Sequence, residues 1–467
     1  MKGYNRAAQK DAQALAALLQ DEGRVLFGDA ISEDYHHDEL SGTSSIPDVV
    51  VRVQTTEEVS AVMRYASQHT IPVTVRGAGT GLVGAAVVVH HGILMDMCAM
   101  DAFLELDEEN LYLTVQPGVL LMDLAAYVEE RGYFYPPDPG EKTATIGGNI
   151  STNAGGMRAV KYGVTRDYVN ALEVVLADGE VLFLGGKVAK NSSGYDLLDL
   201  IIGAEGTLAV ITKAVLRLLP LPKRIVSMLV PFPTLAGAIR TVPAITASGA
   251  GPTAVEFMER EVLLDAEEYL GKPFPDNTAD AYLLLKFDGT HPEEIERAFA
   301  TVADICLAAG ALDVLISDTE EREESIWTAR GAFLEAIKGS TTEMDEVDIV
   351  VPQSCVAELA EYTHSLAGEV GMRIKCFGHA GDGNLHAYLL RDDMPEDEWQ
   401  AKLHTAMDKL YEKGRELQGK PSGEHGIGYA KRRWLAQATH PRELALMQAV
   451  KRVFDPQLIL NPGKVCE

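Results

Sequence analysis

Cysteine is scarce in this chain, and the few cysteines are far apart. The 467 residues include five, which form no Cys-x-x-Cys pair and no ferredoxin-like run. They are Cys98, Cys306, Cys355, Cys376 and Cys466. This spacing argues against a disulfide framework and against an iron–sulfur cluster. A reducing compartment is the simplest interpretation.

Long apolar runs are missing as well. No stretch of about 18 apolar residues occurs in the sequence, so no membrane-spanning helix is expected. Lys, Asp, Gln and Glu interrupt residues 1–23, which therefore do not resemble a secretory signal. We expect a cytoplasmic protein.

Positive charge is in deficit. The chain has 41 Lys and Arg against 69 Asp and Glu, a formal net charge of −28. Such a field repels nucleic-acid phosphates and anionic lipid, so neither is an expected partner. It also repels small anionic substrates. A site for an organic acid would therefore need its own positive charge, from an arginine or a metal.

The chain is long enough for roughly two to four domains of ordinary size. Hydrophobic residues make up 46% and charged residues 24%, as in globular rather than disordered proteins. Helical spacing over 7–21 is followed by a strand-like segment at 47–53, and a helix-start signal at 55–58 precedes a strand at 71–75. This β-α-β order predicts an α/β opening.

Further along, the pattern changes twice. Glycines and short β-branched runs are dense over 76–222, and Pro220-x-Pro222 marks a boundary. Strands and helices then alternate as in an α+β domain over 223–390, and 395–418 has helical spacing. Glycine-rich loops return over 421–467, with a helix around 441–453.

A first glycine cluster, Arg76 to Gly84, directly follows the strand predicted at 71–75. Backbone N–H groups of such a loop can surround a pyrophosphate because no Cβ blocks close approach. The competing interpretation is the Rossmann fingerprint, which needs a helix to begin inside the glycine run. The residues that follow, 85–97, look strand-like instead. Alone, this loop does not identify a cofactor.

Two more glycine clusters follow. Residues 136–140 and 145–156 combine Gly-Gly pairs with Asn, Ser and Thr, which offer hydrogen-bond donors with little bulk. A surface linker would have a similar composition, but apolar strands flank this segment. Residues 203–212 again turn tightly into a strand.

The order of these motifs resembles the FAD-binding domain of the vanillyl-alcohol oxidase type of flavoproteins. The motifs are R-G-x-G-T-G-L, P-P-D-P, T-x-G-G-N-x-x-x-N-A-G-G, Y-G-x-T-R-D and G-x-E-G-T-L. Within that group, the chain is similar to the branch that holds the glycolate oxidase FAD subunit, D-lactate dehydrogenase and D-2-hydroxyglutarate dehydrogenase. The match runs from about residue 45 to the C-terminus.

The resemblance implies an α+β fold: a two-subdomain FAD-binding domain of the PCMH type plus an α+β cap, or substrate, domain with an antiparallel sheet. We expect an N-terminal helix and arm over 1–45 and the FAD-binding domain over 46–222. The cap domain is expected over 223–418, and a C-terminal segment, 419–467, is expected to return to the FAD domain.

The resemblance also implies the cofactor contacts, with Gly77 to Leu82 at the pyrophosphate. Family members with covalent flavin commonly carry a His in that loop, where this chain has Thr80, so noncovalent FAD is expected. The implied FAD-binding residues are Arg76, Gly77, Ala78, Gly79, Thr80, Gly81, Leu82, Pro137, Asp138, Thr145, Gly148, Asn149, Ser151, Asn153, Ala154, Gly155, Gly156, Tyr162, Glu205, Ile211 and Asn461.

Two histidine motifs suggest a metal. Turn residues 380–383 separate His379 from His386, so the two side chains could converge, and a second tight loop places Glu424 beside His425. Each histidine alone is more often a turn or core residue. Together, two His and one Glu suit a divalent metal such as Zn, Fe, Mn or Co.

The family resemblance assigns roles to these residues. It implies that His379, His386 and Glu424 bind the metal and that His425 is the general base, an imidazole being suited to accept a proton near neutral pH. Asn384 would orient the substrate or the flavin edge. Arg330 matches the arginine that binds the substrate carboxylate, although a surface helix arginine is the alternative.

One segment departs from the relatives. Residues 342–352 are acidic where the hydroxyglutarate-specific members, as we align them, place a lysine for the distal carboxylate. Glu346 or a neighbour would repel a second carboxylate. A short monocarboxylate such as D-lactate is therefore the preferred substrate, with glycolate and D-2-hydroxyglutarate as alternatives.

The chain looks most like clostridial-type D-lactate dehydrogenases that work with an electron-transferring flavoprotein. That partner, or another redox partner, is expected to take the electrons, with flavin bifurcation to NAD as a further hypothesis. Two rivals remain open: a flavin electron-transfer subunit without a substrate site, and an NADPH-dependent enzyme that reduces an enolpyruvyl sugar. Neither rival gives a role to the two histidine motifs.

Overall fold

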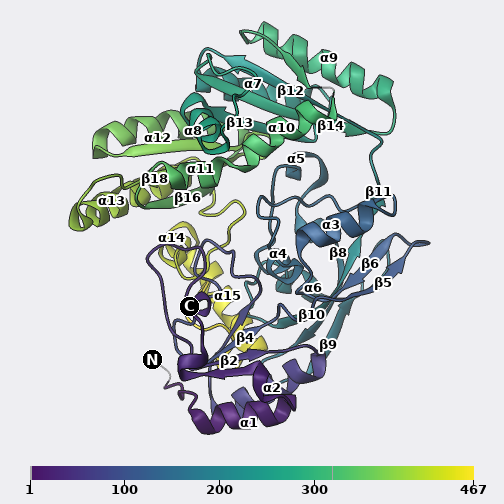
Figure 1. Cartoon of the computed structure of the whole chain (residues 1–467), viewed down its shortest axis with the longest axis vertical. Helices are drawn as coiled ribbons and strands as arrows, with labels where there is room; N and C mark the ends of the chain where they lie inside the picture. Colours follow the sequence, from purple (N-terminus) through teal and green to yellow (C-terminus); the bar gives the residue numbers. More distant parts are fainter. Residues whose placement is uncertain (1–2, 318, 467) are drawn as a thin grey trace. The chain divides into compact units, whose positions relative to one another are not determined.

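The computed structural model describes residues 3–317 and 319–466 and divides them into two compact units (Figure 1). Unit 1 consists of residues 1–154, 164–221 and 424–467. Unit 2 consists of residues 155–163 and 222–423, so it is inserted into unit 1 along the chain.

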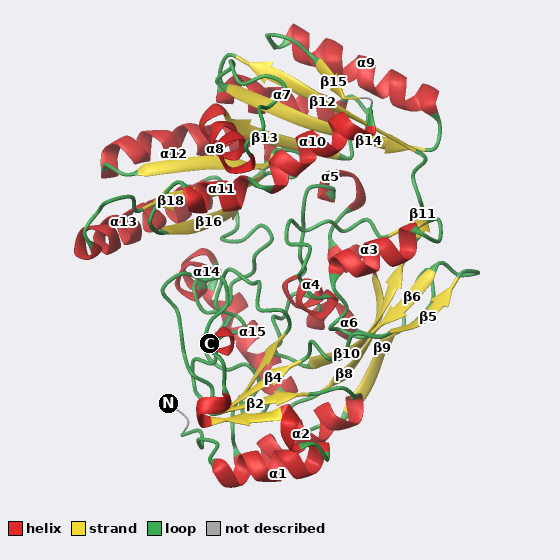
Figure 2. Ribbon diagram, in the orientation of Figure 1, coloured by secondary structure: helices red, strands yellow, loops and turns green. Residues whose placement is uncertain are grey.

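Unit 1 begins with a four-stranded sheet in the order β1-β2-β4-β3, of which β2 and β4 are labelled in Figure 2. Three strands are parallel and β1 is antiparallel to β2. Apolar side chains of α1 and α2 form one buried core with this sheet, including Leu15 and Met63, which are fully buried. The elements are β1 (Val25–Phe27), β2 (Val49–Arg52), β3 (Val73–Arg76), β4 (Ile93–Asp96), α1 (Gln9–Leu19) and α2 (Thr56–His69).

A second, five-stranded sheet completes unit 1 in the order β5-β6-β10-β8-β9, with every pair antiparallel. Its strands are β5 (Phe103–Asp107), β6 (Tyr112–Val115), β8 (Val169–Val175), β9 (Val181–Gly185) and β10 (Val210–Arg217). The remaining elements of the unit are α3 (Leu121–Glu129), β7 (Tyr133–Phe134), α4 (Ile146–Thr152), α6 (Leu197–Ile201), β11 (Leu219–Pro220), α14 (Arg432–Ala438) and α15 (Pro441–Phe454).

The prediction of a strand over 85–97 is wrong for the first half of that segment. Only Ile93–Asp96 forms a strand, β4, and 85–92 is a loop. The carbonyls of Ala85 and Val87 accept hydrogen bonds from Lys464 Nζ, both at 2.6 Å, instead of from a neighbouring strand. No helix begins in the glycine cluster or this loop, so the prediction that the cluster is not a Rossmann fingerprint is confirmed.

Unit 2 is built on a seven-stranded antiparallel sheet in the order β15-β12-β14-β13-β17-β18-β16. The strands are β12 (Arg224–Phe232), β13 (Ala254–Glu259), β14 (Ala281–Gly289), β15 (Leu315–Ser317), β16 (Met344–Val350), β17 (Arg373–His379) and β18 (Asn384–Leu390). The helices are α5 (Ala159–Tyr162), α7 (Leu235–Ala247), α8 (Arg260–Leu270), α9 (Pro292–Ala308), α10 (Glu320–Gly331), α11 (Phe333–Gly339), α12 (Val356–Val370) and α13 (Glu396–Glu416).

The two faces of this sheet are covered by different helices. Met258 and Phe377 share one face and pack in a core cluster with α8, α10 and α11. We call it the α10 face. Helices α7 and α12 pack against β13 and β17. Side chains alternate along a strand, so the residues next to Met258 and Phe377 in sequence point to the opposite face of the sheet. We call this the α12 face.

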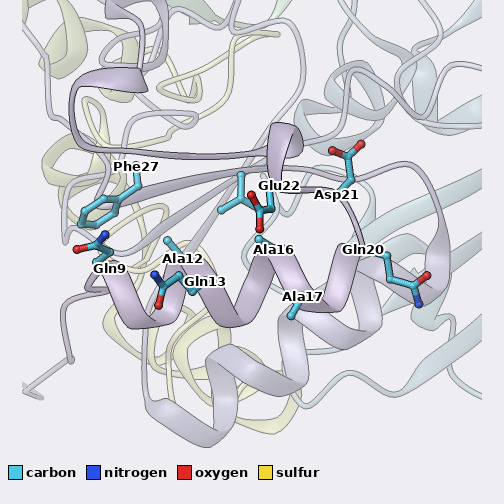
Figure 3. Close-up of a pocket in the computed structure, with 10 residues that line it drawn as sticks. Gln9, Ala12, Gln13, Ala16, Ala17, Gln20, Asp21, Glu22 and Phe27 are labelled. Carbon is cyan, nitrogen blue, oxygen red and sulfur yellow. The ribbon is translucent and has the colours of Figure 1, made fainter.

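A groove of about 520 Å³ runs along α1 in unit 1 (Figure 3). Gln9, Gln13 and Ala16 of the helix line it together with Glu22 and Phe27. None of the residues predicted from the sequence to bind FAD, metal or substrate is among its lining residues.

Within the described residues, no helix has both the length and the apolar character needed to cross a bilayer.

A glycine in the turn between β17 and β18 gives a stability prediction. Gly383 has φ +90°, and a Cβ there would lie 2.1 Å from the carbonyl oxygen of Val351. We expect Gly383→Ala to lower the thermal unfolding midpoint by roughly 4–8 °C, the equivalent of about 2 kcal/mol. Gly339→Ala, at a position with nothing within 4 Å, is the matched control. Equal midpoints for the two variants would contradict this account.

Candidate active site

The predicted FAD-binding residues fall into two groups. Unit 1 holds most of them, and unit 2 holds Gly155, Gly156 and Tyr162. Tyr162 donates to Asp288 Oδ1 at 2.9 Å within unit 2.

In unit 1, the glycine clusters lie against one another. A Cβ on Gly77 would lie 2.2 Å from Thr145 Oγ1, so the first cluster packs directly on the start of the second. Thr145 also caps α4 by accepting a hydrogen bond from Gly148 N at 3.2 Å. The third cluster joins through Glu205, whose N–H donates to Ser151 O at 2.8 Å.

Glu205 is the centre of this assembly. It is buried, and its two carboxylate oxygens accept hydrogen bonds from Ile427 N and Gly428 N, each at 2.7 Å. Asn461 Nδ2 donates to the backbone carbonyl of Glu205 at 2.7 Å. Burial raises the pKa of Glu205 to about 7, although the two N–H donors and Lys464 oppose the rise.

Arg76 forms hydrogen bonds with the backbone of the N-terminal arm. Its guanidinium donates to His37 O at 2.6 Å and to Asp34 O at 2.8 Å, and the side chain is buried. A Cβ on Gly79 would lie 2.0 Å from Arg76 Nη2, so this glycine leaves the room that the guanidinium occupies. Arg76 therefore ties the glycine loop to the N-terminal arm.

Five polar side chains of unit 2 share the α10 face. Strand register places Glu256 opposite His379 and Asp348 opposite His386, and Phe377 lies opposite His386. Alternation then puts the two histidines on one face, and Glu346, two positions from Asp348, joins them. The rings of His379 and His386 lie 5.4 Å apart, centroid to centroid, at an angle of 89°.

A buried carboxylate holds His379. Nδ1 of the ring lies 2.8 and 2.9 Å from the two oxygens of Glu256, whose side chain is completely buried. Arg330 of α10 donates to the same carboxylate, from Nε at 3.0 Å and from Nη2 at 2.5 Å. Burial would raise the pKa of Glu256, but the positive charges of His379 and Arg330 outweigh it and hold the pKa below its ordinary value.

His386 has a carboxylate of its own. Its Nδ1 lies 2.9 Å from Glu346 Oε1, and Asp348 Oδ1 is 4.0 Å away. In both histidines Nδ1 is engaged by a carboxylate, so Nε2 is the ring atom suited to bind a metal. This arrangement is common behind metal-binding histidines because it fixes the tautomer and the ring orientation.

Asn384 and the second histidine motif are linked through Asp348. Asn384 Nδ2 donates to Asp348 Oδ1 at 2.8 Å, whereas its Oδ1 is buried without a hydrogen-bond partner among the described residues. Gly423 N lies 3.1 Å from both oxygens of Asp348. Glu424 follows Gly423 in the chain, as the first residue of the last segment of unit 1, and its Oε1 lies 3.5 Å from His425 Nε2.

Sequence reasoning missed the carboxylates that hold the histidines. Glu346 was interpreted as a charge that repels a dicarboxylic substrate, and the structure gives it a second role, as the partner of His386. Glu256 was not singled out, although it is an acidic residue inside an otherwise apolar strand, VEFM. A buried acid in such a strand calls for a charged partner, and that signal could have found it.

Two family models match the chain. An FAD binding domain matches residues 47–185, and the C-terminal domain of FAD linked oxidases matches residues 221–465. The chain belongs to the FAD-linked oxidase family. It is an FAD-dependent oxidoreductase, as the motifs predicted.

Whole-chain relatives agree with this assignment. The chain is 49% identical to a D-lactate dehydrogenase of Anaerostipes hadrus, over 95% of this chain and 94% of that protein. It is 39% identical to the glycolate oxidase subunit GlcD of Bacillus subtilis (strain 168), over 96% and 95%. A solved p-cresol methylhydroxylase has the same fold, with a TM-score of 0.82, 18% identity and coverage of 99% and 98%. The predicted fold class is confirmed.

One glycine of the first cluster, Gly81, leaves room of the kind that FAD needs. A Cβ on Gly81 would have only one atom within 4 Å, Asp38 Oδ2 at 3.8 Å, so open space adjoins the backbone at that point. Backbone N–H groups facing such a space suit a pyrophosphate.

The raised pKa of Glu205 predicts how stability depends on pH. The folded protein holds this proton more tightly than the unfolded chain, whose Glu titrates near its ordinary value of 4.5. Stability is therefore lost as pH rises from about 4.5 to about 7. Between those values, we expect the thermal midpoint of the FAD-saturated wild type to fall relative to that of Glu205→Gln. Parallel curves for the two proteins would show that Glu205 ionises normally.

Proposed function

We propose that this protein oxidises a D-2-hydroxy acid, D-lactate above all, to the 2-oxo acid with a divalent metal and FAD. The observation that carries the proposal is the pair His379 and His386, each with Nδ1 on its own carboxylate, on one face of a sheet in an FAD-linked oxidase. A protein that only carried electrons would have no use for two oriented imidazoles.

The donor set suits a divalent first-row metal. Two imidazole Nε2 atoms and one carboxylate, with positions left open for substrate, are typical of catalytic sites for zinc or iron. We propose Glu424 as the carboxylate. It follows Gly423, which is held by Asp348 on the same strand face as His386. Bound metal would supply Lewis-acid polarisation of the substrate hydroxyl and carboxylate oxygens.

The remaining roles belong to residues of the chain itself. His425 accepts the hydroxyl proton of the substrate at an imidazole nitrogen. The buried Oδ1 of Asn384 accepts a hydrogen bond from the substrate and orients it. Bound FAD supplies the oxidising power for loss of hydride from C2.

Arg330 has two proposed roles. Its predicted role is to bind the substrate carboxylate, for which a guanidinium offers five donors. Two of its nitrogens, Nε and Nη2, contact Glu256. The same side chain therefore holds the carboxylate that orients His379.

We further propose that an electron-transferring flavoprotein, or another redox partner, accepts the electrons. The glycine loop after β3 opens no helix, so this chain has no Rossmann fingerprint there for a nicotinamide. If the purified chain alone reduced NAD with D-lactate, the partner would be unnecessary and this part of the proposal would fail.

The substrate preference rests on charge. Asp348 is buried and the Glu346 side chain is 10% exposed, both on the face that carries the histidines, and their charges would repel a second carboxylate. Glycolate, which has a single carboxylate, is the alternative that the GlcD relative favours. D-2-hydroxyglutarate is disfavoured on this ground.

One anaerobic experiment tests the proposal. The FAD-loaded protein is mixed with D-lactate, L-lactate, glycolate or D-2-hydroxyglutarate, with and without a chelator, and the flavin absorbance is followed. We expect D-lactate to bleach the flavin fastest and the chelator to suppress the reaction. His425→Asn should slow the bleaching by about 100-fold or more, since a positioned base contributes about that much. Equal bleaching by wild type and His425→Asn would reduce the protein to a flavin carrier.

The carboxylates behind the histidines give a second prediction. Glu346→Gln keeps an acceptor for His386 Nδ1 but removes its charge, so we expect weaker metal binding by about 10–100-fold. Titration of chelator-treated protein with Mn²⁺ measures the loss. Glu343→Gln is the matched control because Glu343 pairs with Arg391, at 2.6 Å. Equal affinities in the two variants would exclude a metal on His386.

A further inference from the structure

A second cluster of metal-ligand types lies on the α12 face of the unit 2 sheet. Register along β13 and β17 pairs Phe257 with Gly378 and Met258 with Phe377, and continuing it by one residue places Glu259 opposite Cys376. Both are three residues from Glu256 and His379 along their strands. Alternation therefore directs them to the opposite face from the two histidines of the proposed catalytic site.

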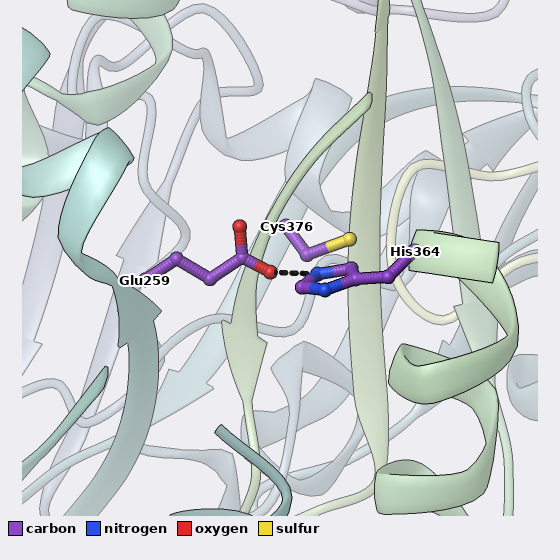
Figure 4. Close-up of side chains that lie close together, drawn as sticks. All are labelled: Glu259, His364 and Cys376. Atoms are coloured by element: carbon purple, nitrogen blue, oxygen red, sulfur yellow. Dashed lines mark hydrogen bonds and ion pairs between the residues drawn. The ribbon is translucent and has the colours of Figure 1, made fainter. Parts of the chain in front are cut away.

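His364 completes the cluster from α12. Its Nε2 makes a hydrogen-bonded ion pair with Glu259 Oε1. One ligand atom of each residue, a carboxylate oxygen, an imidazole nitrogen and the thiol sulfur, lies within 4.8 Å of the others. Figure 4 shows Glu259 and Cys376 reaching from the strands toward the His364 ring. Glu259 lies 105 residues before His364, and His364 and Cys376 belong to different elements. No sequence motif therefore reveals the cluster.

Burial and charge suit a cation here. Cys376 is completely buried, Glu259 is nearly so, and the His364 side chain is 47% exposed. Glu261 adds a second negative charge that acts on His364. Lys375, the neighbour of Cys376 in sequence, pairs instead with Asp265.

Two groups of the cluster have shifted pKa values. Burial raises the pKa of the Cys376 thiol well above its ordinary value, and the charge of Glu259 adds to the rise. The hydrogen bond to Glu259 raises the pKa of His364, although burial opposes it.

We propose that Glu259, His364 and Cys376 bind a zinc-class divalent cation, with the fourth position open to water on the exposed side of His364. For the sulfur to bind, the Cys376 thiol releases its proton to solvent, and the cation lies between sulfur, nitrogen and oxygen. Metal–ligand bonds of about 2.0–2.3 Å place tetrahedral ligand atoms roughly 3.5 Å apart. For a cation to enter, the Glu259–His364 contact has to open and the three ligand atoms, now within 4.8 Å of one another, have to surround it.

Such a cation would join three elements, because β13, β17 and α12 each contribute one ligand. It would be a structural site, separate from the one proposed for catalysis, and it does not depend on the proposed function. Only this site contains sulfur. A sulfur signal on the metal therefore reports on it alone.

Zinc X-ray absorption tests the proposal. The FAD-loaded protein is treated with chelator, given zinc in excess, passed through a desalting column and analysed for zinc content and for its nearest scatterers. We expect a sulfur scatterer at about 2.3 Å. Cys376→Ser and His364→Gln should each lose about one equivalent of zinc, and Cys376→Ser should also lose the sulfur signal. Cys306→Ser, at a buried cysteine of α9 outside the cluster, is the matched control and should keep both.

The two metal sites can be separated in the same experiment. His379→Asn should lose zinc but keep the sulfur scatterer, and Cys376→Ser should keep D-lactate-dependent flavin bleaching. Wild-type protein without a sulfur scatterer, or Cys376→Ser with an unchanged zinc content and sulfur signal, would overturn the inference. Because His364 is half-exposed, His364→Gln keeps the test valid if Cys376→Ser fails to fold.

Discussion

The contact between Glu256 and His379 is the constraint on which the candidate active site depends. A carboxylate with no exposed surface is costly unless charge and hydrogen bonds compensate, and here an imidazole and the Arg330 guanidinium both do so. The three side chains come from β17, β13 and α10, so the pairing fixes a helix to the sheet as well as a ring to its orientation. Removing His379 or Arg330 would leave the buried carboxylate with one of these two partners, and removing Glu256 would take from both the carboxylate that they share.

Acidic side chains also hold other residues of the histidine motifs on this sheet. Glu346 contacts His386, and Asp348 accepts hydrogen bonds from Asn384 and Gly423, so acids on the α10 face position residues of both histidine motifs. A strongly acidic protein thus uses buried acids to hold imidazoles in place. The net charge of −28 includes residues with this internal role.

Features encoded locally could be predicted from the sequence, whereas those built across strands could not. The turn at 380–383 and the order of the glycine motifs depend on neighbours in sequence, and they led to the correct family. Glu256 lies 123 residues from His379, and only strand register unites them. Helix α4 was also missed because its Gly-Gly pair disfavours a helix, yet Thr145 caps its start and Asn153, at φ 51°, ends it. In the loop at 85–92, apolar β-branched residues suggested a strand, but two of its carbonyls accept hydrogen bonds from Lys464, which lies far away in sequence.

The insertion of unit 2 into unit 1 sets an order of assembly during synthesis. Residues 424–467 supply the N–H groups that hold Glu205, and Lys451 and Asn461 bind carbonyls of the preceding segments. A ribosome makes all of unit 2 before it makes these residues. The inserted unit can therefore fold on the nascent chain. The contacts that hold Glu205 among the glycine clusters form only after residues 424–467 have been made.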